Sequence, residues 1–356
     1  MTTLIIPCSG KSSRFPNIKP KWLYTHPNGK LMIERAIENF LPNKKIKKKI
    51  ITITKEIDKK YNARFILNQI FKGNVKVLVL NKSTDSASQT VYNTIINLKI
   101  KGQILVKDCD NFFRIDKQFK IQKKNFVLYC DVKKNSEIQN IHQKSFLITN
   151  DKNQLINIEE KKIVSDKICV GLYSFKSTND FIKHYKNCHN NISLKETYVS
   201  YIVKSMITDN HLFLASEAID YEDYGTFGDW LKIRRDYRTF FVDIDGVIFL
   251  NKGKYGKKNW DTKDEIIKDN VNILTKLNSK TTEIIFTSSR PDTYKKKLTS
   301  ELKKIGFSNF KLILGLNHGQ RILINDFAIS NPNPSAASLN IARNSSQLKN
   351  MIESLN

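Results

Sequence analysis

The amino-acid sequence predicts an α/β protein with two doubly wound domains, each built on a mostly parallel sheet. Short apolar runs that are typical of strands alternate with stretches of helical spacing. This alternation begins afresh near residue 239, and in each series a pair of aspartates follows a hydrophobic strand. The length of 356 residues agrees with two domains, because a single hydrophobic core rarely organises so long a chain.

The first series of elements occupies the N-terminal part of the chain. Its expected strands are rich in Ile, Leu and Val and lie at 4–7, 50–54, 75–80, 103–107 and 126–131. Its expected helices, in which apolar residues recur at helical spacing, lie at 32–41, 58–71 and 88–98. Strands that alternate with helices favour parallel pairing, because two parallel strands need a crossover between them.

The second series repeats this pattern in the C-terminal part. Its expected strands lie at 240–242, 283–286, 311–314 and 322–324, and its expected helices at 264–277 and 292–305. The restart places the boundary at 235–238, so we expect one domain over residues 1–235 and another over 238–356. Ligands bind beyond the carboxyl ends of the strands in such sheets, so motifs at strand ends are candidates for function.

The formal net charge of +26 raises the question of a nucleic-acid partner. The lysines are spread through nearly every segment, with dense runs only at 44–49 and 295–297, and Asn and Ile are also abundant. Such a composition favours a solvated basic surface that attracts small anions over a nucleic-acid interface. We therefore expect no nucleic-acid partner.

Compartment and membrane association follow from apolar runs and cysteine usage. No run approaches the roughly 18 apolar residues of a membrane span, and the N-terminus enters a strand without a basic, export-type leader. The five cysteines contain no C-x-x-C pair that would indicate a zinc or redox site. These observations predict a cytoplasmic protein with reduced cysteines and no membrane span.

The loop after the first strand is a candidate phosphate-binding loop. It combines small and basic residues, namely Gly10, Lys11, Ser12, Ser13, Arg14, Lys19 and Lys21. Small residues after a buried strand expose backbone N–H groups to a phosphate chain, and the basic side chains can neutralise its charge. With a single glycine, the loop is also compatible with an ordinary turn beside a basic surface.

A pair of aspartates ends the strand expected at 103–107. Asp108 and Asp110 are two residues apart, so in an extended chain both carboxylates face the same side and could reach one hard cation. An aspartate pair after a strand is also a common loop start. The conjunction with the basic loop favours the metal-site interpretation.

These motifs resemble the sugar-1-phosphate nucleotidyltransferases, in particular the glucose-1-phosphate thymidylyltransferase and cytidylyltransferase group. The matching stretches are 10–15 with Pro20 and Lys21, the aspartate pair, Glu160 and Lys161 before the Gly171 strand, and Asp223 in an Asp-x-Gly-Thr turn. Phe112 and Phe113 favour Asp110 as the family's first metal aspartate, with Asp108 as the alternative. The family's loop usually has two glycines, and Lys162 stands where a proline is usual.

The resemblance implies roles for several residues. Arg14 would hold the triphosphate, Lys21 would clamp a phosphate, and Asp110 with Asp223 would hold Mg²⁺. Gln89 is a candidate for reading the base, and Glu160, Lys161 and Gly171 belong to the substrate-binding set. The implied partners are a nucleoside triphosphate and a sugar or polyol phosphate. The identity of the base stays open.

The strand expected at 240–242 ends in the second aspartate pair. Asp243 and Asp245 face one side, and Gly246 allows a sharp turn. This motif resembles motif one of the haloacid dehalogenase phosphatases. The resemblance implies that Asp243 is the nucleophile, that Asp245 is the general acid and base, and that both aspartates lie at a Mg²⁺ site.

Further residues of the C-terminal half fit the same family pattern. Thr287 and Ser288 follow a strand where the family binds phosphate, Arg290 is another phosphate candidate, and Asp326 stands where the family places an acidic Mg²⁺ ligand. The shielding cation is Arg321 or Lys311, and the sequence leaves both open.

Together the two resemblances imply a bifunctional, Mg²⁺-dependent nucleotidyltransferase and phosphatase that makes precursors of surface polysaccharide, such as capsule. One alternative keeps a single enzyme activity and makes the other domain a regulatory or binding module. A nucleic-acid-binding protein is the third interpretation. The order of the two reactions and the oligomeric state, a homo-oligomer included, stay open.

Overall fold

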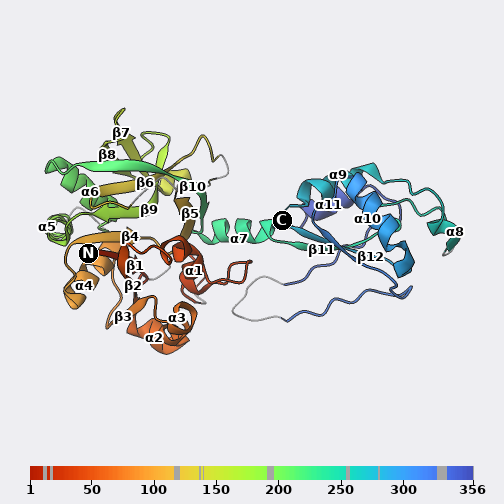
Figure 1. Cartoon of the computed structure of the whole chain (residues 1–356), viewed down its shortest axis with the longest axis horizontal. Coiled ribbons are helices and arrows are strands. Elements are labelled where there is room, and N and C mark those ends of the chain that lie inside the picture. The colour runs from red at the N-terminus through yellow and green to blue at the C-terminus, as the bar shows by residue number, and fades with distance from the viewer. Residues whose placement is uncertain are drawn as a thin grey trace. The chain divides into compact units, whose positions relative to one another are not determined.

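Strand β1 (Thr2–Pro7) lies inside the larger of two sheets, and all six of its residues are buried. It belongs to the first of two compact units, Met1–Trp230 and Leu231–Asn356 (Figure 1). The computed structural model describes residues 1–10, 14–16, 19–115, 121–135, 138, 140–190, 196–253, 257–279, 281–326 and 335–355.

The sheet of the larger unit has ten strands within the described residues. Besides β1, these are β2 (Ile46–Thr54), β3 (Lys76–Leu80), β4 (Gln103–Lys107), β5 (Asn111–Ile115), β6 (Asn125–Asp131), β7 (Ser145–Thr149), β8 (Leu155–Glu160), β9 (Lys167–Phe175) and β10 (Phe213–Asp223). The order is β3-β2-β1-β4-β9-β6-β10-β5, with β7 and β8 forming a hairpin beside β9. Most strands on this path run in one direction, while β9 and β5 run in the other.

Helices cover both faces of this sheet. They are α1 (Met32–Ile37), α2 (Lys55–Tyr61), α3 (Ala63–Phe71), α4 (Ala87–Leu98), α5 (Thr178–His189) and α6 (Val199–Thr208). Helix α7 (Phe227–Asp236) follows β10, and the short 3₁₀ helices are η1 (Lys21–Leu23), η2 (Glu38–Phe40) and η3 (Ile141–Gln143). Because side chains alternate along a strand, Leu4 and Ile6 share a core with α1 and α3, whereas Ile5 packs with α4, α5 and α6. The doubly wound α/β prediction is confirmed for this unit.

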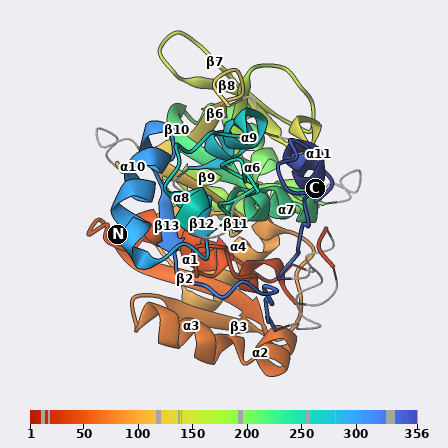
Figure 2. The same ribbon diagram turned by 90° about the vertical axis from the view of Figure 1, so that its right-hand side faces the viewer.

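The helix expected at 58–71 is interrupted. Asn62 adopts the left-handed conformation with φ of 51°, so α2 ends there and α3 begins at the next residue. Asparagine accepts this conformation more readily than most residues. Both short helices lie beside β3, as the two views of the ribbon agree (Figures 1 and 2).

The smaller unit contains a three-stranded parallel sheet in the order β11-β12-β13. Its elements are β11 (Thr239–Asp243), α8 (Lys257–Trp260), α9 (Lys268–Leu277), β12 (Glu283–Thr287), η4 (Asp292–Tyr294), α10 (Lys295–Lys304), β13 (Phe310–Ile313) and α11 (Leu348–Glu353). Val242, Ile284 and Phe286 from the sheet share a core with Leu274 of α9 and Leu298 of α10. This unit is therefore also α/β and parallel.

The prediction of a strand at 322–324 is wrong. Residues 321–326 are irregular, and Ile322 and Ile324 are 75% and 88% exposed. The apolar run has strand propensity, but a strand forms only when a neighbour pairs with its backbone. Consequently Asp326 does not end a strand.

The division between the units falls within α7, between Trp230 and Leu231. The sequence placed the boundary slightly later, at 235–238, where the second series of strands begins. Among the described residues, no helix is long and apolar enough to cross a bilayer.

Candidate functional site

The main candidate site in the larger unit forms where β4 and β10 end. Asn111, the first residue of β5, pairs with Asp223, the last residue of β10. The backbone N–H of Tyr224 donates to the carbonyl oxygen of Asp110 over 2.9 Å. Strand pairing therefore brings together two aspartates that are more than a hundred positions apart in the sequence.

Both carboxylates border the space beside Gly225. A Cβ atom added at residue 225 would stand 3.1 Å from Oδ1 of Asp223, 3.7 Å from Oδ2 of Asp110 and 3.8 Å from Nζ of Lys144. The Gly225 N–H also donates to Oδ1 of Asp223 over 3.0 Å. The missing side chain leaves a small space lined by carboxylate oxygens, which are the donors that hard cations prefer.

Each carboxylate is paired with a lysine. Lys21 forms an ion pair with Asp110, and Lys144 forms one with Asp223. Burial alone would raise the pKa of Asp110, but the charges of Lys21 and Arg14 outweigh it and hold that pKa well below its ordinary value. The pKa of Asp223 is raised, because burial outweighs the attraction of Lys144. Asp110 is therefore the more firmly ionised of the two.

Lys144 was not predicted from the sequence. It follows η3 and lies in no recognised motif, and lysines are so frequent in this chain that one more gives no signal. Only the tertiary structure brings it to Asp223. Of the two lysines that form ion pairs here, the sequence indicated Lys21 and did not indicate Lys144.

Asp108 has different surroundings from Asp110. Its carboxylate packs over Gly171 of β9, where φ is +69° and an added Cβ would stand 2.7 Å from Cγ of Asp108. Burial first, and then the charge of Asp110, raise the pKa of Asp108 to about 6. Gly171 was predicted to belong to the substrate-binding set, and its observed contact is with this carboxylate.

A buried lysine lies beneath the aspartate pair. Lys107 donates to the carbonyl oxygen of Asp108 over 2.8 Å and to Oδ1 of Asn111 over 2.5 Å. Burial lowers its pKa to about 8, although Asp108 and Asp110 oppose this shift. Its hydrogen bonds stabilise the turn that carries both aspartates.

The basic loop is described only in part. Lys11, Ser12 and Ser13 lie outside the described residues, so their predicted contacts stay predictions. Gly10 is exposed, and apart from its chain neighbours no atom of the described residues lies within 4 Å of the Cβ that it lacks. Arg14 is exposed, and its charge lowers the pKa of Asp110. The carbonyl oxygen of Arg14 accepts a hydrogen bond from the N–H of Phe227 over 3.3 Å.

The remaining predicted residues of this unit make local contacts. Gln89 closes the first turn of α4, because its Oε1 accepts from the Asp85 N–H over 2.7 Å. Glu160 accepts hydrogen bonds from two serine hydroxyls, those of Ser145 and Ser200, over 2.5 and 2.6 Å. Lys161 donates to the hydroxyl of Tyr198 over 2.5 Å. Their roles in substrate binding stay predictions.

A second candidate site lies at the end of β11 in the smaller unit. Asp243 pairs with Thr287 of β12, so both lie at the carboxyl edge of the sheet. Burial and the charge of Asp245 raise the pKa of Asp243 to about 6, and Arg321 opposes this shift. Lys311 instead pairs with Glu283 over 2.7 Å near the other ends of the strands. This favours Arg321 as the cation near Asp243.

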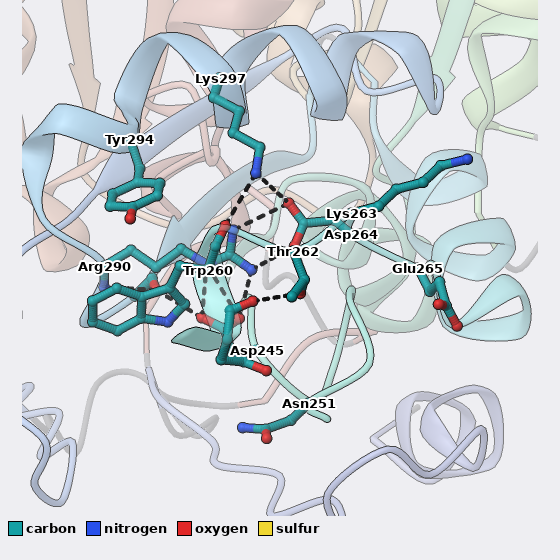
Figure 3. A network of polar contacts seen from close by, with 12 residues as sticks. Asp245, Asn251, Trp260, Thr262, Lys263, Asp264, Glu265, Arg290, Tyr294 and Lys297 are labelled. Carbon is teal, nitrogen blue, oxygen red and sulfur yellow. Dashed lines mark hydrogen bonds and ion pairs between the residues drawn. The ribbon is translucent and has the colours of Figure 1, made fainter. Parts of the chain in front are cut away.

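Arg290, which the sequence offers as a phosphate ligand, has a side chain that is only 1% exposed and lies between Asp245 and Asp264. Its role in phosphate binding stays a prediction. Nη2 donates to Asp245 over 2.6 Å and to Asp264 over 2.9 Å, and Nε donates to Asp245 over 3.1 Å (Figure 3). The hydroxyl of Ser288 also donates to Asp245, over 3.1 Å. A buried guanidinium needs carboxylate partners, and these two satisfy it.

The sequence also contained no sign that Asp264 belongs to this site, and it predicted only that a helix begins there. Helix α9 begins later, at Lys268, and the Asp264 side chain is 7% exposed and directed at Arg290. Glu301 of α10 lies beside it, and burial followed by the nearby carboxyl raises the pKa of Glu301 to about 7. This network connects the aspartate motif to α10.

Comparison with solved structures finds similar folds, among them the following three. A nucleoside-diphosphate-sugar pyrophosphorylase from Vibrio cholerae RC9 is 17% identical with a TM-score of 0.56, over 65% of this chain and 100% of that one. A UDP-glucose pyrophosphorylase complexed with UDP-glucose is 11% identical with a TM-score of 0.53, over 67% and 98%. A CTP:phosphocholine cytidylyltransferase from Streptococcus pneumoniae is 19% identical with a TM-score of 0.50, over 66% and 98%.

No protein-family model and no curated protein matches the sequence. The smaller unit is too short to supply the matched share of the chain, so the structural likeness rests on the larger one. The unit Met1–Trp230 therefore has the fold of these nucleotidyltransferases and pyrophosphorylases.

Proposed function

We propose that the larger unit transfers a nucleotidyl group from a nucleoside triphosphate to a sugar or polyol phosphate and releases pyrophosphate. The observation that carries this proposal is the convergence of Asp110, Asp223 and Lys144 on the space beside Gly225. The fold supports it, because the similar structures are named as a nucleoside-diphosphate-sugar pyrophosphorylase, a UDP-glucose pyrophosphorylase and a CTP:phosphocholine cytidylyltransferase.

The donors present fit a divalent cation, and we propose Mg²⁺. Asp110 and Asp223 supply oxygen atoms from two strand ends, and the missing Cβ of Gly225 leaves room between them. When bound, the cation would neutralise charge on the phosphate groups. Binding would also relieve the repulsion between the two carboxylates.

The chain's own residues then have separate tasks. An oxygen of the acceptor phosphate attacks the α-phosphorus, a bond to that phosphorus forms, and the bond to the leaving pyrophosphate breaks. Lys21 and Lys144 lie at the carboxylates that would hold the cation, so both lysines would be suited to bind phosphate oxygens of the substrates. Arg14, near Asp110, is suited to the triphosphate tail. Catalysis of this type consists mainly of positioning and charge stabilisation.

The test is a matrix of reactions with CTP, UTP, dTTP and GTP against sugar and polyol phosphates, with pyrophosphate and phosphate measured separately. We expect one or a few pairs to release pyrophosphate, and chelation of divalent cations to stop the reaction until Mg²⁺ is restored. Asp110→Asn and Asp223→Asn should each lower the rate about 100-fold or more. Asp151→Asn, at an exposed turn, is the matched control. Release of pyrophosphate at the wild-type rate by either site variant would refute this assignment.

For the smaller unit we propose phosphomonoester hydrolysis, with Asp243 as the nucleophile. Its place at a strand end, opposite Thr287 and near Arg321, supports this proposal. A carboxylate oxygen of Asp243 attacks phosphorus, the bond to the alcohol breaks, and water then releases phosphate from the aspartyl-phosphate. Asp245 is held by Arg290 and Ser288, so a role as proton donor requires it to exchange these hydrogen bonds for one to substrate.

Asp243→Asn should abolish phosphate release and leave pyrophosphate release intact. Equal loss of both activities would contradict separate sites. An active larger unit beside an inactive smaller one would instead favour a binding or regulatory module. The place of both reactions in making surface polysaccharide precursors rests on the sequence resemblance alone.

A further inference from the structure

Two histidines and an aspartate gather near the C-terminal end of α6. His184 lies on α5, Asp209 follows directly after α6, and His211 lies just before β10. One potential ligand atom from each residue lies within 4.8 Å of the other two. None of these residues belongs to the aspartate motifs at the ends of β4, β10 or β11.

His184 is held in one orientation. Its side chain is 2% exposed, and Nδ1 lies 2.8 Å from the hydroxyl oxygen of Ser205 on α6. Nε2 makes no hydrogen bond to the described residues and lies 3.4 Å from Oδ2 of Asp209. If Nδ1–H donates to Ser205, the lone pair of Nε2 is directed at the cluster. A hydrogen bond from the other ring nitrogen commonly orients a metal-binding imidazole in this way.

The other two residues can adapt to a ligand. Asp209 is exposed and pairs with Lys183 over 2.7 Å, and the half-buried ring of His211 stands at 88° to that of His184 with centroids 5.5 Å apart. A simple His184–Asp209 pair would explain one contact. It explains neither the position of His211 nor why the buried Nε2 has no hydrogen bond to any described residue.

We propose that His184, Asp209 and His211 form a binding site for a transition-metal cation of the Zn²⁺ type. Two imidazoles and one carboxylate suit such a cation better than Mg²⁺, which prefers oxygen donors. Three protein ligands leave a fourth position for water. The site would join α5 to the segment that enters β10, the strand that carries Asp223 at its other end.

The experiment uses the full chain prepared without a histidine tag. Isothermal titration with Zn²⁺ should show one site in an Asp110→Asn background, which removes a carboxylate from the other candidate metal site. Absorption of bound Co²⁺ should report tetrahedral nitrogen and oxygen coordination. Thermal unfolding of the larger unit should shift upward by about 5 to 10 °C when Zn²⁺ is in 100-fold excess over its dissociation constant.

His211→Ala and Asp209→Asn should each weaken Zn²⁺ binding at least about 10-fold. Both positions are accessible to solvent, so we expect these variants to fold as the wild type does. Circular dichroism checks this. His189→Ala is the control: it removes an exposed histidine from α5, the helix that carries His184, and should leave Zn²⁺ binding unchanged. Failure of the Asp110→Asn protein to bind Zn²⁺, or equal Zn²⁺ binding with and without His211→Ala in that background, would overturn the proposal.

Discussion

Asp108 occupies the space that a side chain at Gly171 would need. The Asp108 N–H donates to the Gly171 carbonyl oxygen over 2.9 Å, and a Cβ at residue 171 would stand 2.7 Å from Cγ of Asp108. The backbone at 171 is also left-handed, with φ of +69°. This contact joins β9 to the turn that carries Asp108 and Asp110.

The first prediction follows from this contact. Gly171→Ala should lower the free energy of unfolding of the larger unit, because alanine costs about 1–2 kcal/mol in the left-handed conformation and also displaces Asp108. Gly73→Ala is the matched control, since Gly73 has φ of +81° and, in the part of the chain that the structure describes, no atom beyond its chain neighbours lies within 4 Å of the missing Cβ. Chemical denaturation measures both variants. If Gly171→Ala and Gly73→Ala lowered the free energy of unfolding equally, the contact with Asp108 would not contribute to stability.

A second prediction concerns Lys144. Lys144→Gln should keep the fold and lower nucleotidyl transfer by about 10-fold or more, because the site loses a cation near the phosphates. Lys133→Gln also removes a lysine from an ion pair, with exposed Asp166, and should retain full activity. Initial rates of pyrophosphate release, measured for both variants and the wild type, test this prediction. Wild-type rates for Lys144→Gln would restrict the lysine to a structural role.

The third prediction is a pH dependence that arises at Asp108. Its pKa rises from 3.8 to about 6 on folding, so between these values the folded state binds more protons than the unfolded state. The contribution of Asp108 to stability is therefore fully present below pH 3.8 and is lost as the pH rises through about 6. In Asp108→Asn, the side chain at residue 108 does not titrate.

Denaturation of wild type and Asp108→Asn across this range tests the prediction. The stability of the variant relative to wild type should increase from about pH 4 to pH 6 and stay level above that range. A relative stability that falls over the same range would show that the folded state favours ionised Asp108.

A fourth prediction concerns the buried network around Arg290. Arg290→Met removes the buried guanidinium that the carboxylates of Asp245 and Asp264 share, so the smaller unit should lose about 3–5 kcal/mol of stability. Lys311→Met breaks the exposed pair with Glu283 and should cost about 0–1 kcal/mol. Pyrophosphate release should persist in both variants. Similar unfolding curves for Arg290→Met and wild type would show that the network does not stabilise the unit.

Local patterns predicted much of this protein. The apolar runs at 50–54 and 103–107 lie in β2 and β4, because a hydrophobic strand is encoded by its own residues and by the helices that alternate with it. The two aspartate pairs follow strands for the same local reason, and this placed Asp110 and Asp243 at sheet edges. The α/β class followed directly from this alternation.

Relationships between distant residues could not be predicted in this way. No spacing in the sequence connects Lys144 to Asp223, or Arg290 to Asp264, since chain folding alone makes these neighbours. The run at 322–324 shows the reverse case, because its composition favours a strand while pairing decides whether one forms. The sequence by itself determined the fold class and the strand ends that carry carboxylates. The tertiary structure decided which charges meet there, because ion pairs depend on contacts that strand pairing and helix packing create.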